Sequence, residues 1–290
     1  MPPITKTTKT KTGSKTKAAA TKAKPQAVIK TANKPASKAK KVARASSGKT
    51  RARVASPGLR ERAHDIEVRL STAMPEPRCE LNHNNAWQLL IATILSAQST
   101  DRMVNRVTPS LFERYPTPAA LSDADQTELE TLVKSTGFFR NKAKSIRAAS
   151  KQIVEQFGGE VPRTLDEITQ LSGVARKTGN VVLGTAYRIP SGMTVDTHAG
   201  RVSRRLQLTK HDDPVKVEHD LCALFPESSW IDMGHRFVLH GRYTCLARSP
   251  KCGSCPVNEL CKAREAAPAA SWQARAKLEG DRVAASFGTT

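Results

Sequence analysis

Apolar residues recur with helical spacing along most of the chain, whereas the alternation typical of strands is scarce. After Asn85, the apolar residues Trp87, Leu90, Ile91, Ile94 and Leu95 repeat with a period of about 3.6 residues. Comparable patterns predict further helices at residues 101–112, 122–136, 142–156, 164–171, 176–187, 196–205, 213–225 and 229–240. The sequence therefore predicts an all-α fold, and no long fixed period indicates a solenoid.

Residues that favour helix ends delimit several of these segments. Asn85 and the pair Asp213–Pro214 are suited to helix N-termini, and Thr164–Glu167 has the sequence of a capping box. Gly137 and Gly241 follow apolar patterns, where glycine commonly ends a helix. We therefore expect helices joined by short connections.

The first part of the chain, residues 1–57, lacks any apolar pattern and any aromatic residue. Residues 1–57 hold 13 Lys, 3 Arg and no acidic residue, so they carry most of the net charge of +21 of the whole chain. Such a segment cannot bury enough apolar surface to fold, so we expect a disordered tail. Its charge suits nonspecific contacts with DNA phosphates, and a solubilising or targeting tail is the alternative. A mitochondrial transit peptide would be richer in Arg and amphipathic.

Six cysteines are present, and four of them crowd into residues 245–261. The chain has no apolar run near 20 residues, so the sequence predicts neither a membrane span nor a secretory signal. A disulfide framework suits a short secreted chain, which this is not. We therefore expect a reducing compartment and a metal site formed by the clustered cysteines.

The four clustered cysteines are Cys245, Cys252, Cys255 and Cys261, with the spacing Cys-x6-Cys-x2-Cys-x5-Cys. Sulfur-only coordination is typical of zinc or of an iron–sulfur cluster. Structural zinc sites usually pair two short Cys-x2–4-Cys motifs, and only one occurs here, so the spacing favours iron–sulfur without deciding it. Between the first two ligands, Arg248 and Lys251 form either a solvated loop or a basic surface that contacts phosphate.

The sequence LSGVARKTGNVV, residues 171–182, places a lysine in the first turn of a helix. Gly173 marks a turn directly before that helix, where free backbone N–H groups can bind an anion. The helix N-terminus and the neighbouring Arg176 both disfavour the protonated form of the Lys177 amine. That placement suits a nucleophilic amine, and a phosphate-binding lysine is the alternative.

Four ordered motifs resemble those of the endonuclease III family of helix-hairpin-helix, iron–sulfur DNA glycosylases. The resemblance covers roughly residues 59–261. Its motifs are LLIATILSAQSTD (89–101), LSGVARKTGNVV (171–182), TVDTH (194–198) and LHGRYTCLARSPKCGSC (239–255). Each motif alone is weak evidence, but four in order together with the cysteine spacing are specific.

The resemblance implies an all-α protein of two lobes. A six-helix barrel with the helix-hairpin-helix would span residues 79–190. Residues 58–78 and 191–268 would form a second lobe, in which the four cysteines hold a [4Fe-4S] cluster. Residues 269–290 are expected to be a flexible C-terminal end.

The resemblance also implies the activity. The chain would be a bifunctional glycosylase and abasic-site lyase that excises oxidised pyrimidines from duplex DNA. Lys177 would form a Schiff base with the sugar, and Asp196 would be its partner carboxylate, although an isolated aspartate at that position is an ordinary N-cap. Strand cleavage would follow by β-elimination. We expect a monomer inside the cell at the DNA, in a bacterial cytoplasm or nucleoid, or in a eukaryotic nucleus or mitochondrion.

Three further residues would contact DNA by the same resemblance. Gln98 would fill the gap left by the flipped nucleotide, Phe138 would wedge the opposite strand, and His198 would lie beside the nucleotide backbone. From their positions in the sequence alone, these residues are a helix-end polar group, a core aromatic and a first-turn polar residue.

Three positions depart from the family pattern. The family hairpin usually has proline where Ser172 stands and a second glycine where Ala175 stands, so Gly173 alone keeps the pattern. Ala175 would be strained if its backbone needed a positive φ. Phe138 is larger than the usual aliphatic wedge. These departures bear on substrate range and turnover.

Two other classes of protein compete with this interpretation. Monofunctional adenine glycosylases share the cluster, but they lack the lysine and carry an additional C-terminal domain, whereas only 29 residues follow Cys261. A non-catalytic DNA-binding protein with a basic tail and a structural metal is the second alternative.

Overall fold

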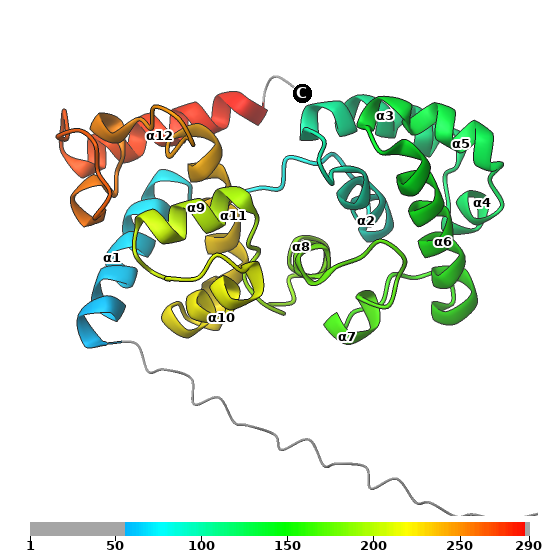
Figure 1. Cartoon of the computed structure of the whole chain (residues 1–290), viewed down its shortest axis with the longest axis horizontal. Coiled ribbons are helices and arrows are strands. Elements are labelled where there is room, and N and C mark those ends of the chain that lie inside the picture. Colours follow the sequence, from blue (N-terminus) through cyan, green and yellow to red (C-terminus); the bar gives the residue numbers. More distant parts are fainter. Residues whose placement is uncertain (1–55, 288–290) are drawn as a thin grey trace, which may run out of the picture. The chain divides into compact units, whose positions relative to one another are not determined.

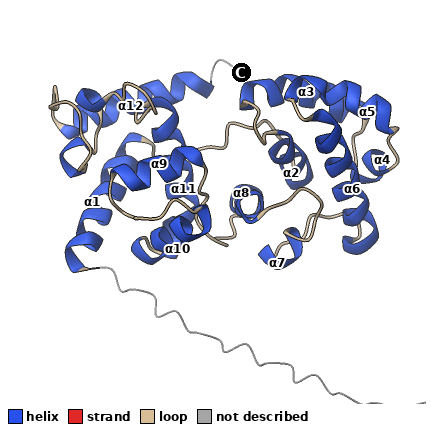
Figure 2. Cartoon of the chain, viewed as in Figure 1, coloured by secondary structure: helices blue, strands red, loops and turns tan. Residues whose placement is uncertain are grey.

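The structure is a computed structural model of the whole chain, and it describes residues 56–287 (Figure 1). All regular elements in this range are helical, which confirms the predicted all-α class (Figure 2). The predicted disordered tail falls almost entirely outside the described residues. The helices are α1 (Pro57–Ala73), α2 (Ala86–Leu95), α3 (Asp101–Arg114), α4 (Pro118–Ser122), α5 (Gln126–Val133), α6 (Phe139–Phe157), α7 (Leu165–Ile168), α8 (Arg176–Tyr187), α9 (Thr197–Arg205), α10 (Pro214–Leu224), α11 (Trp230–Tyr243) and α12 (Trp272–Phe287).

The helices enclose two separate apolar cores within one compact unit. The first core belongs to α2–α8, and α2 lies at its centre, because Trp87 and all residues from Leu89 to Leu95 are buried. The second core belongs to α1 and α9–α12. Helices α1 and α12, blue and red in Figure 1, pack side by side although they lie at opposite ends of the described chain. The second lobe is therefore assembled from both ends of the sequence.

Two segments of the chain connect the two cores. One precedes α2 in the sequence, and the other follows α8. The first crossing follows α1 and is fixed by Arg236 of α11, whose guanidinium donates to the carbonyls of Met74 and Pro75 at 2.9 and 3.1 Å. The second crossing follows α8, and Gly184 of α8 lies against Ile231 of α11. Helix α8 thus packs on α2 of the first lobe while it faces α11 of the second.

The predicted N-terminal caps are present. Asn85 and Asp213 each accept a hydrogen bond from a backbone N–H in the first turn of their helices. Thr164 accepts from the N–H of Glu167 and also donates its hydroxyl to that carboxylate. Side chains of this type satisfy N–H groups that have no partner inside the helix.

Two predicted boundaries are wrong. Ser122 ends α4 instead of opening a helix. The next helix, α5, begins only after Asp125, which is its N-cap. Helix α11 does not end before Gly241 but continues to Tyr243. Gly241 is buried against the backbone of His198. Because glycine has no side chain, α11 can pack closely on α9 at this point.

The expectation of a flexible end at residues 269–290 is wrong for most of that segment, because residues 272–287 form α12. Its buried residues are Arg275, Ala276, Glu279 and Val283, which lie on one face of the helix. Two of these four are charged, so an apolar pattern alone does not reveal the face. Among residues 56–287, no helix is long and apolar enough to cross a membrane.

Candidate active site and metal centre

The turn before α8 is shaped by one glycine and one glutamine. Gly173 has a φ of +77°, and a Cβ there would lie 2.8 Å from the Cβ of Ser145, so both backbone and space require glycine. The N–H of Ser172 donates to Oε1 of Gln152 at 2.8 Å. Proline at position 172 would lack this donor. The departure at Ser172 is therefore matched by a contact within the protein.

Ala175 has an extended backbone with a φ of −94° and a ψ of 168°. The expected strain at Ala175 is therefore absent, because any residue adopts this conformation. Ala175 is the N-cap of α8 and offers no side-chain acceptor. Among the described residues, nothing accepts from the backbone N–H groups of Arg176, Lys177 and Thr178. These donors form the type of helix N-terminus that binds a phosphate.

Lys177 is an exposed residue in the first turn of α8. The adjacent Arg176 turns instead to α10, where its guanidinium donates to Glu218 at 2.9 Å. The Glu218 side chain is only 5% exposed, and its hydrogen bond with Arg176 raises the pKa of that arginine. The charge of Arg176 is thus balanced by Glu218, so the repulsion expected between Arg176 and the Lys177 amine is largely offset.

Asp196 is the N-cap of α9, and its Oδ1 accepts from the N–H groups of His198 and Ala199, both at 2.8 Å. The same residue lines a pocket together with Lys177. Lys177 comes from the first lobe and Asp196 from the second lobe. The structure therefore brings the two predicted catalytic residues to one pocket, and the helix cap fixes the orientation of the carboxylate.

One wall of this pocket is an ion-pair network that the sequence analysis missed. Arg242 of α11 donates to both Glu80 and Asp101, and the hydroxyl of Tyr243 donates to Glu80. Burial opposes the charge of Arg242, but Asp101 and Glu80 outweigh it and raise the pKa of the guanidinium. The network joins the crossing segment at Glu80, the start of α3 and the end of α11. The motif 239–255 contains Arg242, and this is the one signal in the sequence that could have drawn attention to it.

Replacing Arg242 with methionine is expected to lower the free energy of unfolding by about 3–5 kcal/mol, because two largely buried carboxylates lose the one cation that pairs with them among residues 56–287. Glu80 and Asp101 are 9% and 17% exposed. Urea unfolding monitored by circular dichroism measures the change. The matched control is Arg188→Met, which breaks an exposed pair with Asp232 and should cost about 1 kcal/mol or less. Equal effects of the two substitutions would contradict the assigned role of the network.

Two histidines at the site are held in neutral form. His235 lines the pocket and lies 3.1 Å from the hydroxyl of Thr185, and burial lowers its pKa to about 4. Burial also lowers the pKa of His198, and the opposing charge of Asp196 does not reverse this. His198 faces a second, larger groove rather than the pocket of Lys177. At neutral pH both imidazoles can therefore donate and accept hydrogen bonds without adding charge.

Gln98 and Phe138 share an uncommon backbone conformation, with φ values of 54° and 47°. Both are exposed, and Phe138 has 64% of its surface accessible, so it is not a core aromatic. A bulky residue with positive φ is strained, and such strain persists where the surrounding structure enforces it. Gln98 follows α2 and Phe138 immediately precedes α6. The fold therefore presents both side chains outward from the ends of well-packed helices.

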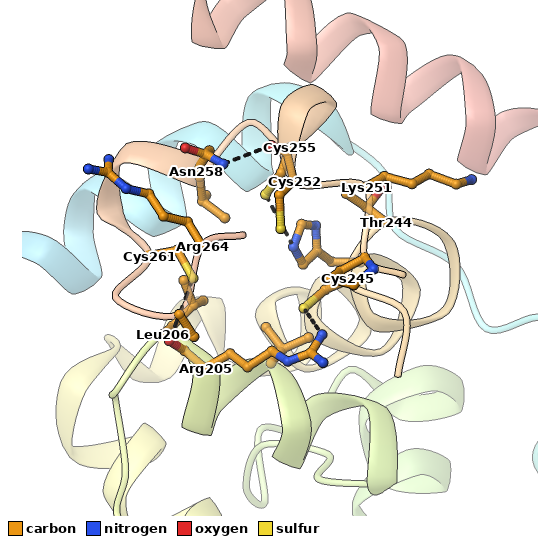
Figure 3. Close-up of a pocket in the computed structure, with 15 residues that line it drawn as sticks. Arg205, Leu206, Thr244, Cys245, Lys251, Cys252, Cys255, Asn258, Cys261 and Arg264 are labelled. Carbon is orange, nitrogen blue, oxygen red and sulfur yellow. Dashed lines mark hydrogen bonds between the residues drawn. The ribbon is translucent and has the colours of Figure 1, made fainter. Parts of the chain in front are cut away.

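The four clustered cysteines line one cavity (Figure 3). Among residues 56–287, no three His, Cys, Asp or Glu side chains are arranged to hold a single metal ion. Four thiolates around one zinc ion would have their sulfur atoms only about 4 Å apart. The sulfur atoms here surround a cavity instead of a point, so the donor set fits a multinuclear iron–sulfur cluster and not a single zinc ion.

Polar groups near the cysteines are suited to sulfur ligands. Nη1 of Arg205 donates to Sγ of Cys245 at 3.4 Å, and Nε2 of His240 lies 3.8 Å from Sγ of Cys255. Burial raises the pKa of the Cys261 thiol, which makes the thiolate costly without a bound cation. Cationic donors directed at sulfur favour a cluster that carries negative charge on its ligands.

Arg248 and Lys251 are exposed on the loop that precedes Cys252. The N–H of Lys251 donates to the carbonyl of Thr244 at 2.9 Å, which closes the loop at its base. Neither side chain forms an ion pair with a described residue. The charges of both side chains therefore face solvent, on a loop that begins at Cys245 and ends at Cys252.

Comparisons with known proteins agree with this geometry. Residues 91–227 match the HhH-GPD superfamily of base excision DNA repair proteins, and residues 245–261 match the iron–sulfur binding domain of endonuclease III. Endonuclease III of Synechocystis sp. is 50% identical over 207 residues, which are 71% of this chain and 94% of the relative. Endonuclease III of Bacillus subtilis (strain 168) is 45% identical over 195 residues, 67% of this chain and 89% of the relative. A solved structure of a trapped endonuclease III–DNA covalent intermediate is 42% identical, with a TM-score of 0.66, and the match covers 69% of this chain and 96% of that chain.

The two-lobed helical fold, the hairpin before α8 and the cysteine-lined cavity thus define a helix-hairpin-helix base excision repair protein with an iron–sulfur site. The two relatives match this chain over most of their own length, which narrows the assignment from the superfamily to one family. The chain belongs to the endonuclease III family. It is a DNA glycosylase with abasic-site lyase activity, and it carries a [4Fe-4S] cluster.

Proposed function

We propose that the chain excises oxidised pyrimidines from duplex DNA, with Lys177 as the nucleophile and Asp196 as its partner carboxylate. The observation that carries this proposal is that both side chains line one pocket although they come from different lobes. An amine that shares a pocket with a carboxylate is suited to Schiff-base chemistry on a sugar, because the carboxylate can serve as the adjacent general base. Duplex DNA with an oxidised pyrimidine or an abasic site is the proposed substrate.

The neutral amine of Lys177 attacks the anomeric carbon of the flipped nucleotide, and the bond between that carbon and the damaged base breaks. The base leaves with the bonding electrons and takes up a proton. Asp196 stabilises the positive charge that develops on the sugar and accepts the proton that the amine releases. Opening of the sugar ring then gives a Schiff base. Loss of a proton from the neighbouring sugar carbon expels the 3′ phosphate, which is β-elimination.

Further contacts would hold the DNA in position. The free N–H groups at the start of α8, next to Gly173 and Ala175, would bind a backbone phosphate. Gln98 would enter the gap left by the flipped nucleotide, and Phe138 would wedge the opposite strand. Their outward, strained conformations support these roles. His198, neutral and half-buried, would lie beside the flipped nucleotide.

The cluster, held by Cys245, Cys252, Cys255 and Cys261, would fix the loop that carries Arg248 and Lys251. When bound, the cluster would supply structural rigidity to this loop. The two cations would then contact phosphates without a loss of loop entropy on binding. We further propose that the enzyme acts as a monomer at the DNA of the cell, in a bacterial nucleoid.

A panel of duplexes tests the proposed substrate class. Each duplex carries one lesion, either thymine glycol, another oxidised pyrimidine, an oxidised purine or an abasic site, and base release and strand cleavage are followed separately. We expect both activities on oxidised pyrimidines and cleavage alone on the abasic site. Excision confined to oxidised purines, or cleavage of abasic sites with no base released from any lesion, would overturn the proposal.

The basic tail, which lies outside the described residues, is proposed to bind phosphates without sequence preference. Deletion of residues 1–55 should weaken binding to undamaged DNA and reduce the slope of log affinity against log salt, because fewer counterions are released. Fluorescence anisotropy at several salt concentrations measures both quantities. Loss of all base release at low salt on tail deletion would contradict this role, since the tail would then belong to the catalytic part.

A further inference from the structure

Helix α12 lies outside both segments that match the family, residues 91–227 and 245–261. Even so, three of its charged residues, Arg275, Glu279 and Arg282, contact the cluster loop or its supports. Their spacing of four and three residues places them on one face of the helix. The opposite face carries an exposed pair, Lys277–Asp281, that contacts none of these groups.

Arg275 is the most deeply placed of the three, with 1% of its surface exposed. Its Nε donates to the carbonyl of Cys255 at 2.8 Å, and its other nitrogens donate to the carbonyl of Ala270 and to Glu259. Cys255 is a cluster ligand, and Glu259 lies between the last two ligands. One buried guanidinium therefore ties the backbone of the third cysteine to Glu259 and to the segment that leads into α12.

Glu279 is fully buried, and its Oε1 lies 2.5 Å from Nδ1 of His240. The other ring nitrogen, Nε2, lies 3.8 Å from Sγ of Cys255. Because the carboxylate accepts the Nδ1 hydrogen, the ring is held with Nε2 towards the sulfur. Glu279 therefore acts on the cluster through His240 as a positioning residue.

Helix α12 is held in place by close packing against α1 and by the hydrogen bonds of a third charged residue, Arg282. A Cβ at Gly280 would lie 2.6 Å from the carbonyl oxygen of Ala73, so glycine lets α12 approach the end of α1. Arg282 donates to the hydroxyls of Thr244 and Ser254 at 2.6 and 3.2 Å. These two residues lie immediately before Cys245 and Cys255, respectively.

We propose that α12 is a clasp for the iron–sulfur cluster, in which Arg275 and Glu279 hold the loop around Cys255 and thereby slow loss of the cluster. The inference rests on the cluster at the four cysteines and not on the roles of Lys177 and Asp196. The predicted consequence is kinetic. Opening of the loop exposes iron to solvent, and the buried contacts from α12 must break before the loop opens.

The test follows the visible absorbance of the full-length, cluster-loaded protein in air with an iron chelator. The variants Arg275→Ala and Glu279→Ala should each lose the cluster about 10-fold faster or more, the range typical of lost outer contacts at metal sites. Arg275→Lys keeps one donor and should restore part of the retention. Lys277→Ala, on the exposed face, should behave as the parent protein.

A second control separates the clasp from a general loss of stability. Val283→Ala removes a buried apolar side chain from the same helix, at a position that lines a groove with residues 73–79 instead of the cysteine cavity. At a matched loss of thermal stability, it should accelerate cluster loss less than Glu279→Ala. Resonance Raman should show altered iron–sulfur stretching bands in Glu279→Ala and unchanged bands in Val283→Ala. Loss of the cluster at the parent rate in both Arg275→Ala and Glu279→Ala, or no faster than in Val283→Ala, would overturn the proposal.

Discussion

Replacing Lys177 with alanine should abolish the covalent adduct that borohydride traps on a duplex with an abasic site. The amine is the group proposed to form the Schiff base, and among residues 56–287 no other lysine lines the pocket that Asp196 shares. Strand cleavage should fall by about 10³-fold or more, as when a covalent nucleophile is removed. Gel analysis after borohydride reduction measures the adduct, and a time course of nicking measures the rate.

The substitution Lys177→Arg separates the nucleophile from the alternative role of a phosphate-binding cation. Arginine keeps the positive charge and can bind a phosphate, but it does not lose its proton in proteins and cannot attack the sugar. We expect binding close to that of the parent protein and no adduct. An adduct in either variant would reject Lys177 as the nucleophile.

Helical periodicity predicted most of the fold because most helices of this chain bury an apolar face. Helix α2 is the clearest case, since its residues from Leu89 to Leu95 are all buried and an asparagine caps its start. Helix α12 escaped prediction because Arg275 and Glu279 occupy its buried face. Charged residues are rarely buried unless they are paired, and the partners of these two lie far away in the sequence. No local pattern contains that information.

The candidate site also combines residues that a local motif reveals with residues whose partners lie far away in the sequence. Lys177 and Asp196 each stand in a short motif, so the sequence could propose them as the catalytic pair, and the structure adds that they share a pocket. The ion pairs around them join residues that are far apart along the chain. Arg176 pairs with Glu218 across 42 positions, and Arg242 pairs with Glu80 across 162. Such pairs depend on how the two lobes pack, which a single sequence does not encode in any local spacing.

The pairing of Arg176 with Glu218 also changes which charges surround the Lys177 amine. From the sequence, two neighbouring charges, the helix N-terminus and Arg176, disfavoured the protonated amine. In the fold, Glu218 takes up the charge of Arg176, and the same contact ties α8 to α10 across the two lobes. The arginine therefore serves to position the helix that carries Lys177.

Asp196→Asn should slow base release by about 10²–10³-fold while the protein stays folded. Asparagine retains a side-chain oxygen that can accept from the N–H groups of His198 and Ala199, and it caps helices about as well as aspartate. What asparagine cannot do is accept the proton of the amine or balance positive charge on the sugar. Single-turnover release of thymine glycol measures the effect, and thermal unfolding checks that the cap persists.

An abasic duplex gives the matched comparison for the same variant. There the base is already absent, so the step that most needs the carboxylate charge is bypassed and borohydride trapping should fall less than base release. Asp196→Ala removes the cap as well and should cost about 1 kcal/mol of stability in addition to the same loss of base release. Base release by Asp196→Asn within a few-fold of the parent rate would show that Asp196 acts only as a helix cap. In that case the proton acceptor would have to be sought among the other carboxylates of the pocket wall, Glu80 and Asp101, although both already bind Arg242.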